Sequence, residues 1–284
     1  MKYTNLRLLA VLLLMAPALG HAVCYGNQDR SDQPLVFSPV PQLPAPTMYS
    51  RWAPLLEAIG KDSGQCFDLV IKPSIPEFEK YLLQGTPDLA YVNPYHAVMA
   101  YKAKRYRPII ADGSSSLTGI LAVKRDGGIQ QLSDLNNKSV AFPAPNAFAA
   151  SLLLRAHLQQ LKINIKPLYV KTHSNVYRSI MIGDAAAGGG VNKTLESEPE
   201  DIQGKLRVLY ESPGYRSHPV VVNSKLSQEL QERIQQSFIA IAKTEEGRKL
   251  LASVQLNEPI IVTYQKDYAP LDKLGLDKLV IRDE

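Results

Sequence analysis

Segments with the apolar pattern of a strand alternate with segments of helical periodicity through most of this 284-residue chain. The short apolar runs 67–71, 89–92 and 140–142 are each followed by a stretch in which apolar residues recur every three to four positions. A repeated strand–helix order is typical of α/β proteins, because a helix is the usual connection between neighbouring parallel strands. We therefore predict an α/β fold with mostly parallel sheets.

Two breaks interrupt this alternation, at Ser114-Ser115-Ser116 and at Ser212-Pro213-Gly214. The chain is also longer than a domain with a single hydrophobic core usually is. Both observations favour two lobes. In parallel sheets, ligands bind at the carboxyl ends of the strands, next to helix N-termini, so we expect a site there.

The N-terminus has the form of a secretory signal peptide. Lys2 and Arg7 precede the apolar run 8–14, and Pro17 and the small-residue end Gly20-His21-Ala22 follow it. The apolar run is shorter than the roughly 20 residues that span a bilayer as a helix. We predict that residues 1–22 are removed on export.

Cys24 and Cys66 are the two cysteines of the chain. A pair of cysteines in an exported protein predicts one disulfide, and two free buried thiols are the alternative. Cys24 also stands near the predicted cleavage site, where a lipid anchor is a second alternative. Because His21-Ala22-Val23 fits the small-residue pattern before a lipidated cysteine poorly, we expect no anchor.

Charge and motifs exclude several classes of protein. Without Lys2 and Arg7, 30 basic residues face 27 acidic ones, a net charge of +3 with no basic run, so we expect no nucleic-acid partner. The chain has no nucleophile elbow, phosphate-binding loop or zincin motif, and its five histidines lack metal-ligand spacing. We predict a protein that is not an enzyme and uses no cofactor or metal. A catalytic triad assembled only in space remains the alternative.

Aromatic and polar residues cluster where the strand at 89–92 passes into a helix. Tyr91, Asn93 and Tyr95 would lie at the carboxyl end of that strand, where rings cover a ligand and polar tips orient it. Tyr49 or Trp52 would face them. The alternative is a core tyrosine and an Asn N-cap before a helix that begins with proline.

A second strand-to-helix junction carries Thr172-His173-Ser174. His173 is placed there to donate a hydrogen bond to an anion at the helix N-terminus. The alternative is a surface histidine near the cap. Gly188-Gly189-Gly190 allow either close approach of a ligand to the backbone or close packing between elements.

Four segments, taken in order, resemble a known family: 88–94, 133–142, 172–174 and 267–271. They are similar to the phosphate/phosphite/phosphonate-binding (PhnD-type) branch of periplasmic solute-binding proteins, over nearly all of the mature chain. The resemblance implies a two-lobed periplasmic binding protein of type II with two crossover strands. It also implies a ligand in the cleft between the lobes and delivery to an ABC transporter. On this basis lobe one is expected at 34–113 plus 217–284, and lobe two at 114–216.

The chain departs from the family at one important place. Phosphonate binders usually carry a Ser-Thr-Ser run at the N-terminus of the long helix of lobe two. Here the stretch after Pro145-Asn146 reads Ala147-Phe148-Ala149-Ala150-Ser151. Backbone N–H groups and the helix dipole remain, but a phosphonate would lose several charge-assisted hydrogen bonds. We therefore expect the family fold with an altered ligand.

These considerations give one set of expected ligand-binding residues: Tyr49, Tyr91, Asn93, Tyr95, Thr118, Asn146, Phe148, Ser151, His173, Ser174 and Gly189. The expected protein is a periplasmic, monomeric binding protein for a small polar or anionic ligand. Its expected membrane partner is the permease of an ABC transporter. A sensor that hands its closed form to a membrane kinase or cyclase is the alternative, and a hydrolase or transferase is the third reading.

Overall fold

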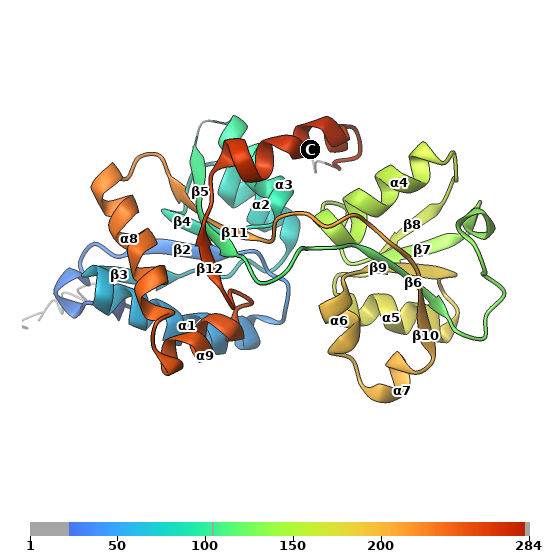
Figure 1. The fold of residues 1–284 in the computed structure, drawn as a ribbon, viewed down its shortest axis with the longest axis horizontal. Coiled ribbons are helices and arrows are strands. Elements are labelled where there is room, and N and C mark those ends of the chain that lie inside the picture. The colour runs from blue at the N-terminus through green and yellow to red at the C-terminus, as the bar shows by residue number, and fades with distance from the viewer. Residues whose placement is uncertain (1–22, 104, 282–284) are drawn as a thin grey trace, which may run out of the picture.

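The structure is a computed structural model that describes residues 23–103 and 105–281 (Figure 1). The predicted signal peptide, residues 1–22, lies outside the described residues. Two lobes lie side by side, each with a sheet and helices packed against it (Figure 1). None of the described helices is long and apolar enough to cross a membrane.

Lobe one contains a seven-stranded sheet in the order β1-β3-β2-β4-β11-β5-β12. The strands are β1 (Tyr25–Gly26), β2 (Leu35–Pro39), β3 (Cys66–Leu69), β4 (Leu89–Tyr91), β5 (Tyr106–Asp112), β11 (Pro219–Asn223) and β12 (Pro259–Ile261). Its helices are α1 (Ala45–Ser63), α2 (Ile75–Leu83), α3 (Pro94–Lys102), α8 (Gln228–Ile241) and α9 (Glu245–Ser253). A short 3₁₀ helix, Gln28–Arg30, follows β1.

Lobe two contains a five-stranded sheet in the order β10-β6-β9-β7-β8. The strands are β6 (Ile120–Lys124), β7 (Ser139–Phe142), β8 (Lys166–Tyr169), β9 (Ala187–Gly190) and β10 (Leu206–Glu211). Its helices are α4 (Leu154–Gln160), α5 (His173–Ile182), α6 (Asn192–Glu196) and α7 (Glu200–Gln203), with a 3₁₀ turn at Leu132–Leu135. The π-helix Phe148–Leu153 leads directly into α4.

The two-lobed α/β architecture agrees with the sequence prediction, but the prediction of mostly parallel sheets is wrong. Parallel pairing joins β3, β2 and β4 in lobe one, and β9, β7 and β8 in lobe two. The remaining pairs are antiparallel. Several of these pairs involve strands that leave or enter a lobe, such as β5 and β11, which run in opposite directions. Strand–helix periodicity reports the order of elements along the chain and does not report these directions.

The two connections between the lobes are paired with each other. The Leu117 N–H donates to the Tyr215 carbonyl at 2.8 Å, and the Tyr215 N–H returns the bond to Leu117 at 3.0 Å. Beside this pair, the Gly119 N–H donates to Ser212 Oγ at 2.9 Å. The crossover segments therefore form a short two-stranded junction at the centre of the molecule (Figure 1).

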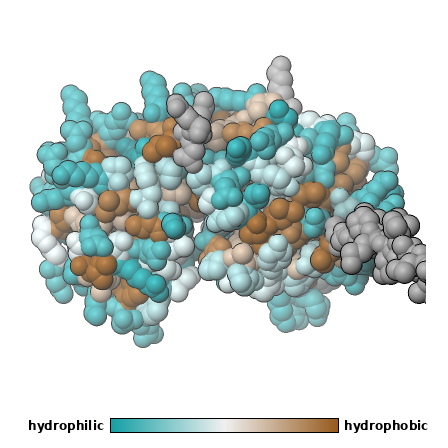
Figure 2. All heavy atoms as spheres, turned by 180° about the vertical axis from the view of Figure 1, so that it is seen from behind, coloured by the Kyte–Doolittle hydropathy of each residue, from teal (hydrophilic) through white to brown (hydrophobic). Residues whose placement is uncertain are grey.

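The C-terminal segment touches both lobes. Short helical turns at Tyr264–Tyr268, Ala269–Leu274 and Leu276–Lys278 follow β12. Tyr264 stacks on Tyr101 of α3, with 3.6 Å between ring centroids. Further along, Arg155 of lobe two donates to the Leu279 carbonyl at 2.9 Å. Seen from behind, the lobes are separated by a notch in the lower half of the view (Figure 2).

Helix α1 shows why the helical spacing of apolar residues is informative. The spaced residues Met48, Trp52, Leu55 and Ile59 are all buried, as an apolar stripe facing a core requires. Pro54 lies inside the helix and does not delay its start, because α1 already begins at Ala45.

Cys24 and Cys66 form the predicted disulfide, with 5.4 Å between their Cα atoms. Cys66 opens β3 and Cys24 stands directly before β1, so the bond fastens this edge of the lobe-one sheet. The adjacent backbone is close-packed as well: a Cβ at Gly26 would lie 2.5 Å from the Cα of Gly60 in α1.

We predict that reduction of this disulfide lowers the free energy of unfolding by roughly 3–4 kcal/mol, because it releases a closed loop in the unfolded chain. The loop spans 42 residues. Urea denaturation of the oxidised protein and of a Cys24→Ser/Cys66→Ser variant measures the difference. Two titratable thiols in the unfolded, unreduced protein would contradict the bond.

Candidate functional site

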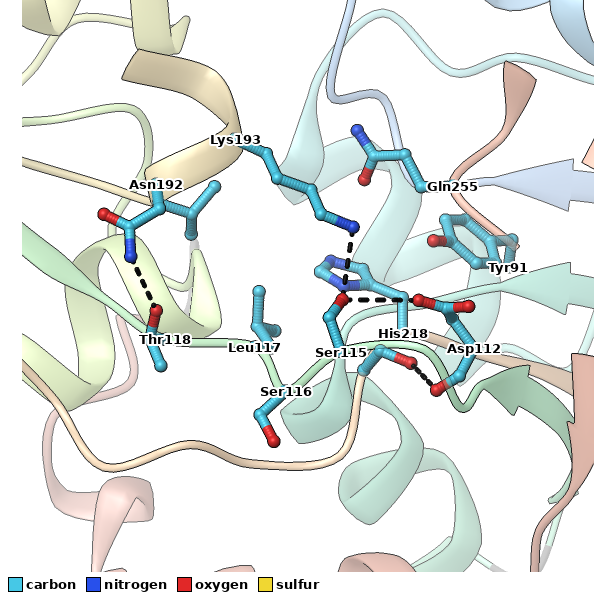
Figure 3. Close-up of a pocket in the computed structure, with 12 residues that line it drawn as sticks. Tyr91, Asp112, Ser115, Ser116, Leu117, Thr118, Asn192, Lys193, His218 and Gln255 are labelled. Atoms are coloured by element: carbon cyan, nitrogen blue, oxygen red, sulfur yellow. Dashed lines mark hydrogen bonds between the residues drawn. The ribbon is translucent and has the colours of Figure 1, made fainter. Parts of the chain in front are cut away.

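A cleft of about 510 Å³ lies between the lobes. Lobe one contributes the loop 40–44, Ile75 and Asn93, and lobe two contributes 147–150 and 171–175. A smaller compartment of about 60 Å³ adjoins it, next to the crossover segments (Figure 3). Both compartments are lined by Leu117, Val191, Lys193, His218 and Gln255, so they form one continuous site.

Two helices of lobe two begin at the large compartment. The π-helix starts at Phe148 with Ala147 as its N-cap, and α5 starts at His173. Thr172 caps α5, since its hydroxyl accepts a hydrogen bond from the Asn175 N–H at 3.2 Å. The first N–H groups of a helix have no intrahelical acceptor and lie at the positive end of the helix dipole. Both starts therefore favour an anion.

Charged side chains of the large compartment have the same preference. Arg51, Lys171, Arg178 and Lys193 line it, and Glu198 is the single carboxylate among its lining residues. The Ser174 hydroxyl donates to Glu198 at 2.6 Å, so this carboxylate already has a partner. The excess of cations raises the local concentration of anionic ligands.

Apolar side chains form the rest of the large compartment. Leu43, Pro44, Ile75 and Pro143 line it together with Phe148. The Phe148 ring is nearly buried and makes an edge contact with Tyr215 of the second crossover, with 5.7 Å between centroids. A ligand with an apolar or aromatic part would therefore find a matching wall.

A chain of rings connects the core of lobe one to the small compartment. Phe37, Trp52, Tyr91 and His218 follow one another with centroid separations of 4.9, 5.0 and 5.5 Å. Tyr91 and His218 line the small compartment. Trp52 stays inside the core, and Tyr49 is 41 % exposed on α1 and lines neither compartment. Neither residue therefore faces Tyr91 across the site as expected. The helical period of α1 turns Tyr49 toward solvent and Trp52 into the core.

Asn93 combines both roles that the sequence left open. Its Oδ1 accepts the His96 N–H at 2.7 Å, which makes it the N-cap of α3, and its side chain also lines the large compartment. Its Nδ2 donates to the Asn146 carbonyl of lobe two at 3.2 Å. Asn93 therefore joins the two lobes at the edge of the cleft.

Asn146 lies outside both compartments, in contrast to the expectation from the sequence. It is 1 % exposed. Its Nδ2 donates to Glu79 and to the Ile281 carbonyl, each at 2.8 Å, while its Oδ1 accepts the Ile281 N–H at 3.1 Å. Asn146 stands directly before Ala147, the N-cap of the cleft-lining π-helix. It therefore connects the start of that helix to α2 and to the C-terminal segment.

Three further expected residues also lie outside the compartments. The Ser151 hydroxyl is buried and donates to the Pro145 carbonyl at 3.0 Å. A Cβ at Gly189 would lie 2.0 Å from the Ala150 carbonyl oxygen, which favours the packing alternative for the glycine run. Tyr95 is buried within α3. By contrast, Thr118 lines the small compartment, and His173 and Ser174 line the large one.

Sequence reasoning missed His218, Lys193 and Gln255, each of which lines both compartments. Each of them stands in a loop or at the start of a short helix, where no periodic pattern or motif in the sequence marks a site. His218 Nε2 lies 3.0 Å from the Gln42 amide nitrogen, so the second crossover meets the proline-rich loop before α1. No group of three or more His, Cys, Asp or Glu side chains among the described residues is arranged to hold a metal.

Both histidines of the site are neutral at physiological pH. Burial lowers the pKa of His173 to about 4. Burial, together with the nearby His96 and His173, lowers the pKa of His218 to about 3. An anion in this cleft is therefore held by helix amides and by Lys and Arg side chains, and the imidazoles act as neutral hydrogen-bonding groups.

The lowered histidine pKa values predict acid sensitivity. Unfolded histidines bind protons near pH 6.5, whereas folded His173 and His218 stay neutral down to about 4 and about 3. Stability should therefore fall as pH drops from about 7 to about 5, where the unfolded state binds more protons. Urea denaturation at a series of pH values measures how the free energy of unfolding depends on pH. In a His173→Asn/His218→Asn variant, the proton uptake on unfolding that this slope reports should be smaller by up to about two protons. An unchanged slope would contradict neutral histidines.

Asn146 should matter for stability more than its size suggests. Asn146→Ala removes several buried hydrogen bonds and leaves Glu79 without one donor, so we expect a loss of about 2–4 kcal/mol in the free energy of unfolding. Asn257→Ala is a matched control, since Asn257 is exposed and its amide has one long contact to Ser114. Equal effects of the two substitutions would contradict the structural role.

Comparisons with known proteins agree with this architecture. Residues 37–268 match the family described as the ABC transporter phosphonate periplasmic substrate-binding protein. The fold is similar to a binding protein component of an ABC phosphonate transporter from Pseudomonas aeruginosa, with 18 % identity, 87 % of each chain covered and a TM-score of 0.75.

Two other solved structures are similar. PhnD1 from Prochlorococcus marinus in complex with methylphosphonate has 13 % identity, a TM-score of 0.76 and coverage of 86 % of this chain and 97 % of the other. A Xanthomonas citri protein bound to ATP has 14 % identity, a TM-score of 0.71 and coverage of 87 % and 99 %. The expectation of a binding protein rather than an enzyme is confirmed by the family match, and the chain belongs to the phosphonate-binding family of periplasmic substrate-binding proteins of ABC transporters.

Proposed function

We propose that this protein captures an anionic organic ligand in the interlobe cleft and delivers it to the permease of an ABC transporter. The ligand carries a phosphonate- or phosphate-like end and a larger body. The observation that carries this proposal is the large compartment, where two helix N-termini and four cationic side chains face apolar walls in a volume of about 510 Å³. The predicted signal peptide supports an exported protein, and the disulfide, which occupies the Cys24 thiol, argues against a lipid anchor.

The lining of the π-helix start argues against a simple phosphonate. Ala147 and Ala149 line the compartment without a side-chain donor, and Phe148 adds a ring. Ser151, the next hydroxyl along the chain, is already bonded to Pro145. Each missing hydrogen bond to a charged oxygen is worth roughly 1.5–3 kcal/mol. A small anion would therefore depend on backbone amides, whereas a larger ligand also contacts the apolar wall.

The relatives support a broad range of ligand sizes for this fold. One solved structure is bound to methylphosphonate and another to ATP. The volume and the cationic lining of the large compartment suit a phosphorylated organic molecule better than a bare oxyanion. Native mass spectrometry of protein purified without refolding would weigh a retained ligand.

We predict weak binding of phosphate, phosphite and methylphosphonate in calorimetric titrations. Organic phosphates with a ring, such as adenosine monophosphate, should bind at least about tenfold more tightly, because their body buries the apolar wall. Sub-micromolar affinity for any of the three small anions would contradict an altered ligand. Uptake of the ligand should be lost in a strain that lacks the permease and retained in a strain that lacks a sensor kinase. This result would identify the permease as the membrane partner.

Restoring hydroxyls should restore affinity for small phosphonates. Ala147→Ser/Ala149→Ser keeps Phe148, whose ring packs on Tyr215, and returns two donors to the helix start. We expect about tenfold tighter binding of methylphosphonate for each hydrogen bond gained. Ala252→Ser on the exposed side of α9 is the matched control. No gain would show that the cleft differs from phosphonate sites beyond this helix start.

A further inference from the structure

The small compartment is a separate polar chamber of the same site. It lies where the first crossover, α6 and the second crossover meet, and Asp112, Ser115, Lys193, His218 and Tyr91 surround it (Figure 3). Its volume is about 60 Å³, which suits a group of a few heavy atoms. A ligand that fills the large compartment reaches this chamber directly, because the two share part of their lining.

Tyr91 presents to the chamber a hydroxyl that no described residue binds. The residue is 3 % exposed, and its ring is fixed between Trp52 and His218. Its hydroxyl has no hydrogen-bond partner among the described residues and is directed toward the interior of the chamber (Figure 3). Burial raises the pKa of Tyr91, so the hydroxyl keeps its proton. Because this hydroxyl faces the chamber and makes no hydrogen bond within the described chain, it is available to an incoming acceptor.

Lys193 adds a positive charge with free donors. Its Nζ lies 3.2 Å from the Ser115 hydroxyl, a neutral partner. An ammonium group has three donors, so one neutral hydroxyl leaves room for an anionic acceptor. The side-chain amide of Gln255, which also lines the chamber, makes no hydrogen bond to another described residue. The donors of the chamber thus come from both lobes: Tyr91 and Gln255 from lobe one, and Lys193 from lobe two.

The carboxylate of Asp112 also lines the chamber, but donors of the chain already occupy its two oxygens. Its two oxygens accept from the Ser114 hydroxyl at 2.7 Å and from the Glu258 N–H at 2.9 Å. Longer bonds from the Ser114 N–H and the Ser115 hydroxyl, at 3.4 Å each, complete the set. His218 stays neutral and its Nε2 faces Gln42. Of the two charged side chains that line the chamber, Lys193 is therefore the one with unused hydrogen-bonding groups.

We infer that the small compartment binds a carboxylate, or a similar anionic oxygen group, at the far end of the ligand. Tyr91 and Lys193 are the donors that recognise it. This inference rests on the proposed function, in which the phosphonate-like end lies at the helix N-termini of the large compartment. The ligand is then a molecule with acceptor groups at both ends, and an ammonium group at the far end is disfavoured.

Two probes of equal length test the inference: 3-phosphonopropionate, which ends in a carboxylate, and 3-aminopropylphosphonate, which ends in an ammonium. In calorimetric titration of the full-length mature protein, the carboxylate probe should bind at least about tenfold more tightly. Tyr91→Phe keeps the ring stack and removes the hydroxyl, so it should weaken the carboxylate probe about tenfold. Lys193→Gln should reduce or abolish the preference between the probes.

Tyr25→Phe and Lys166→Gln are the matched controls, since neither residue lines the site, and they should leave both affinities unchanged. Equal binding of the two probes, or tighter binding of the ammonium probe, would overturn the inference while leaving the proposed function intact. Binding of neither probe would not contradict the proposed function, which already predicts weak binding of small phosphonates without a larger body. Glutarate, a phosphorus-free dicarboxylate, then decides: binding that Tyr91→Phe weakens supports the carboxylate subsite, and no binding overturns it.

Discussion

The hydrogen-bonded pair between Leu117 and Tyr215 holds the two crossover segments together, and the site depends on it. Leu117 lines both compartments, and Tyr215 supports the ring of Phe148. The same two segments carry Thr118 and His218 to the small compartment. Because both segments are short, they hold the strand ends of lobe one close to the helix N-termini of lobe two. The cleft therefore forms at the point where the chain twice changes lobes.

Around this junction, polar groups that hold the structure together differ from those that remain available for binding. Asp112, Asn146 and Ser151 are buried and saturated by hydrogen bonds within the chain. Lys193 and the Tyr91 hydroxyl, by contrast, retain unused donors at the small compartment. A group already satisfied gains little from a ligand, whereas an unused donor gains a full hydrogen bond. This difference decides which polar residues near the cleft are available for recognition.

Residues in regular patterns were the ones that could be located in advance. The disulfide, the buried face of α1 and the helix start at Thr172-His173-Ser174 each follow from local spacing or composition. Asn146 shows the limit of such reasoning: it precedes a cleft helix in sequence, yet its side chain turns to Glu79 and Ile281, which are far from it along the chain. Which partners a polar side chain finds depends on distant segments that local patterns do not specify.

By itself the sequence determined the α/β class, the two lobes, the cysteine pairing and the loss of hydroxyls at Ala147 to Ala149, because each follows from periodicity, breaks or residue type. Only the tertiary structure decided strand direction, since the antiparallel pairing of β11 with β4 and β5 requires knowledge of where the second crossover returns. It also decided that His218, Lys193 and Gln255 meet Tyr91 in one chamber. These residues lie far apart along the chain, and their proximity results from the packing of two lobes against one junction.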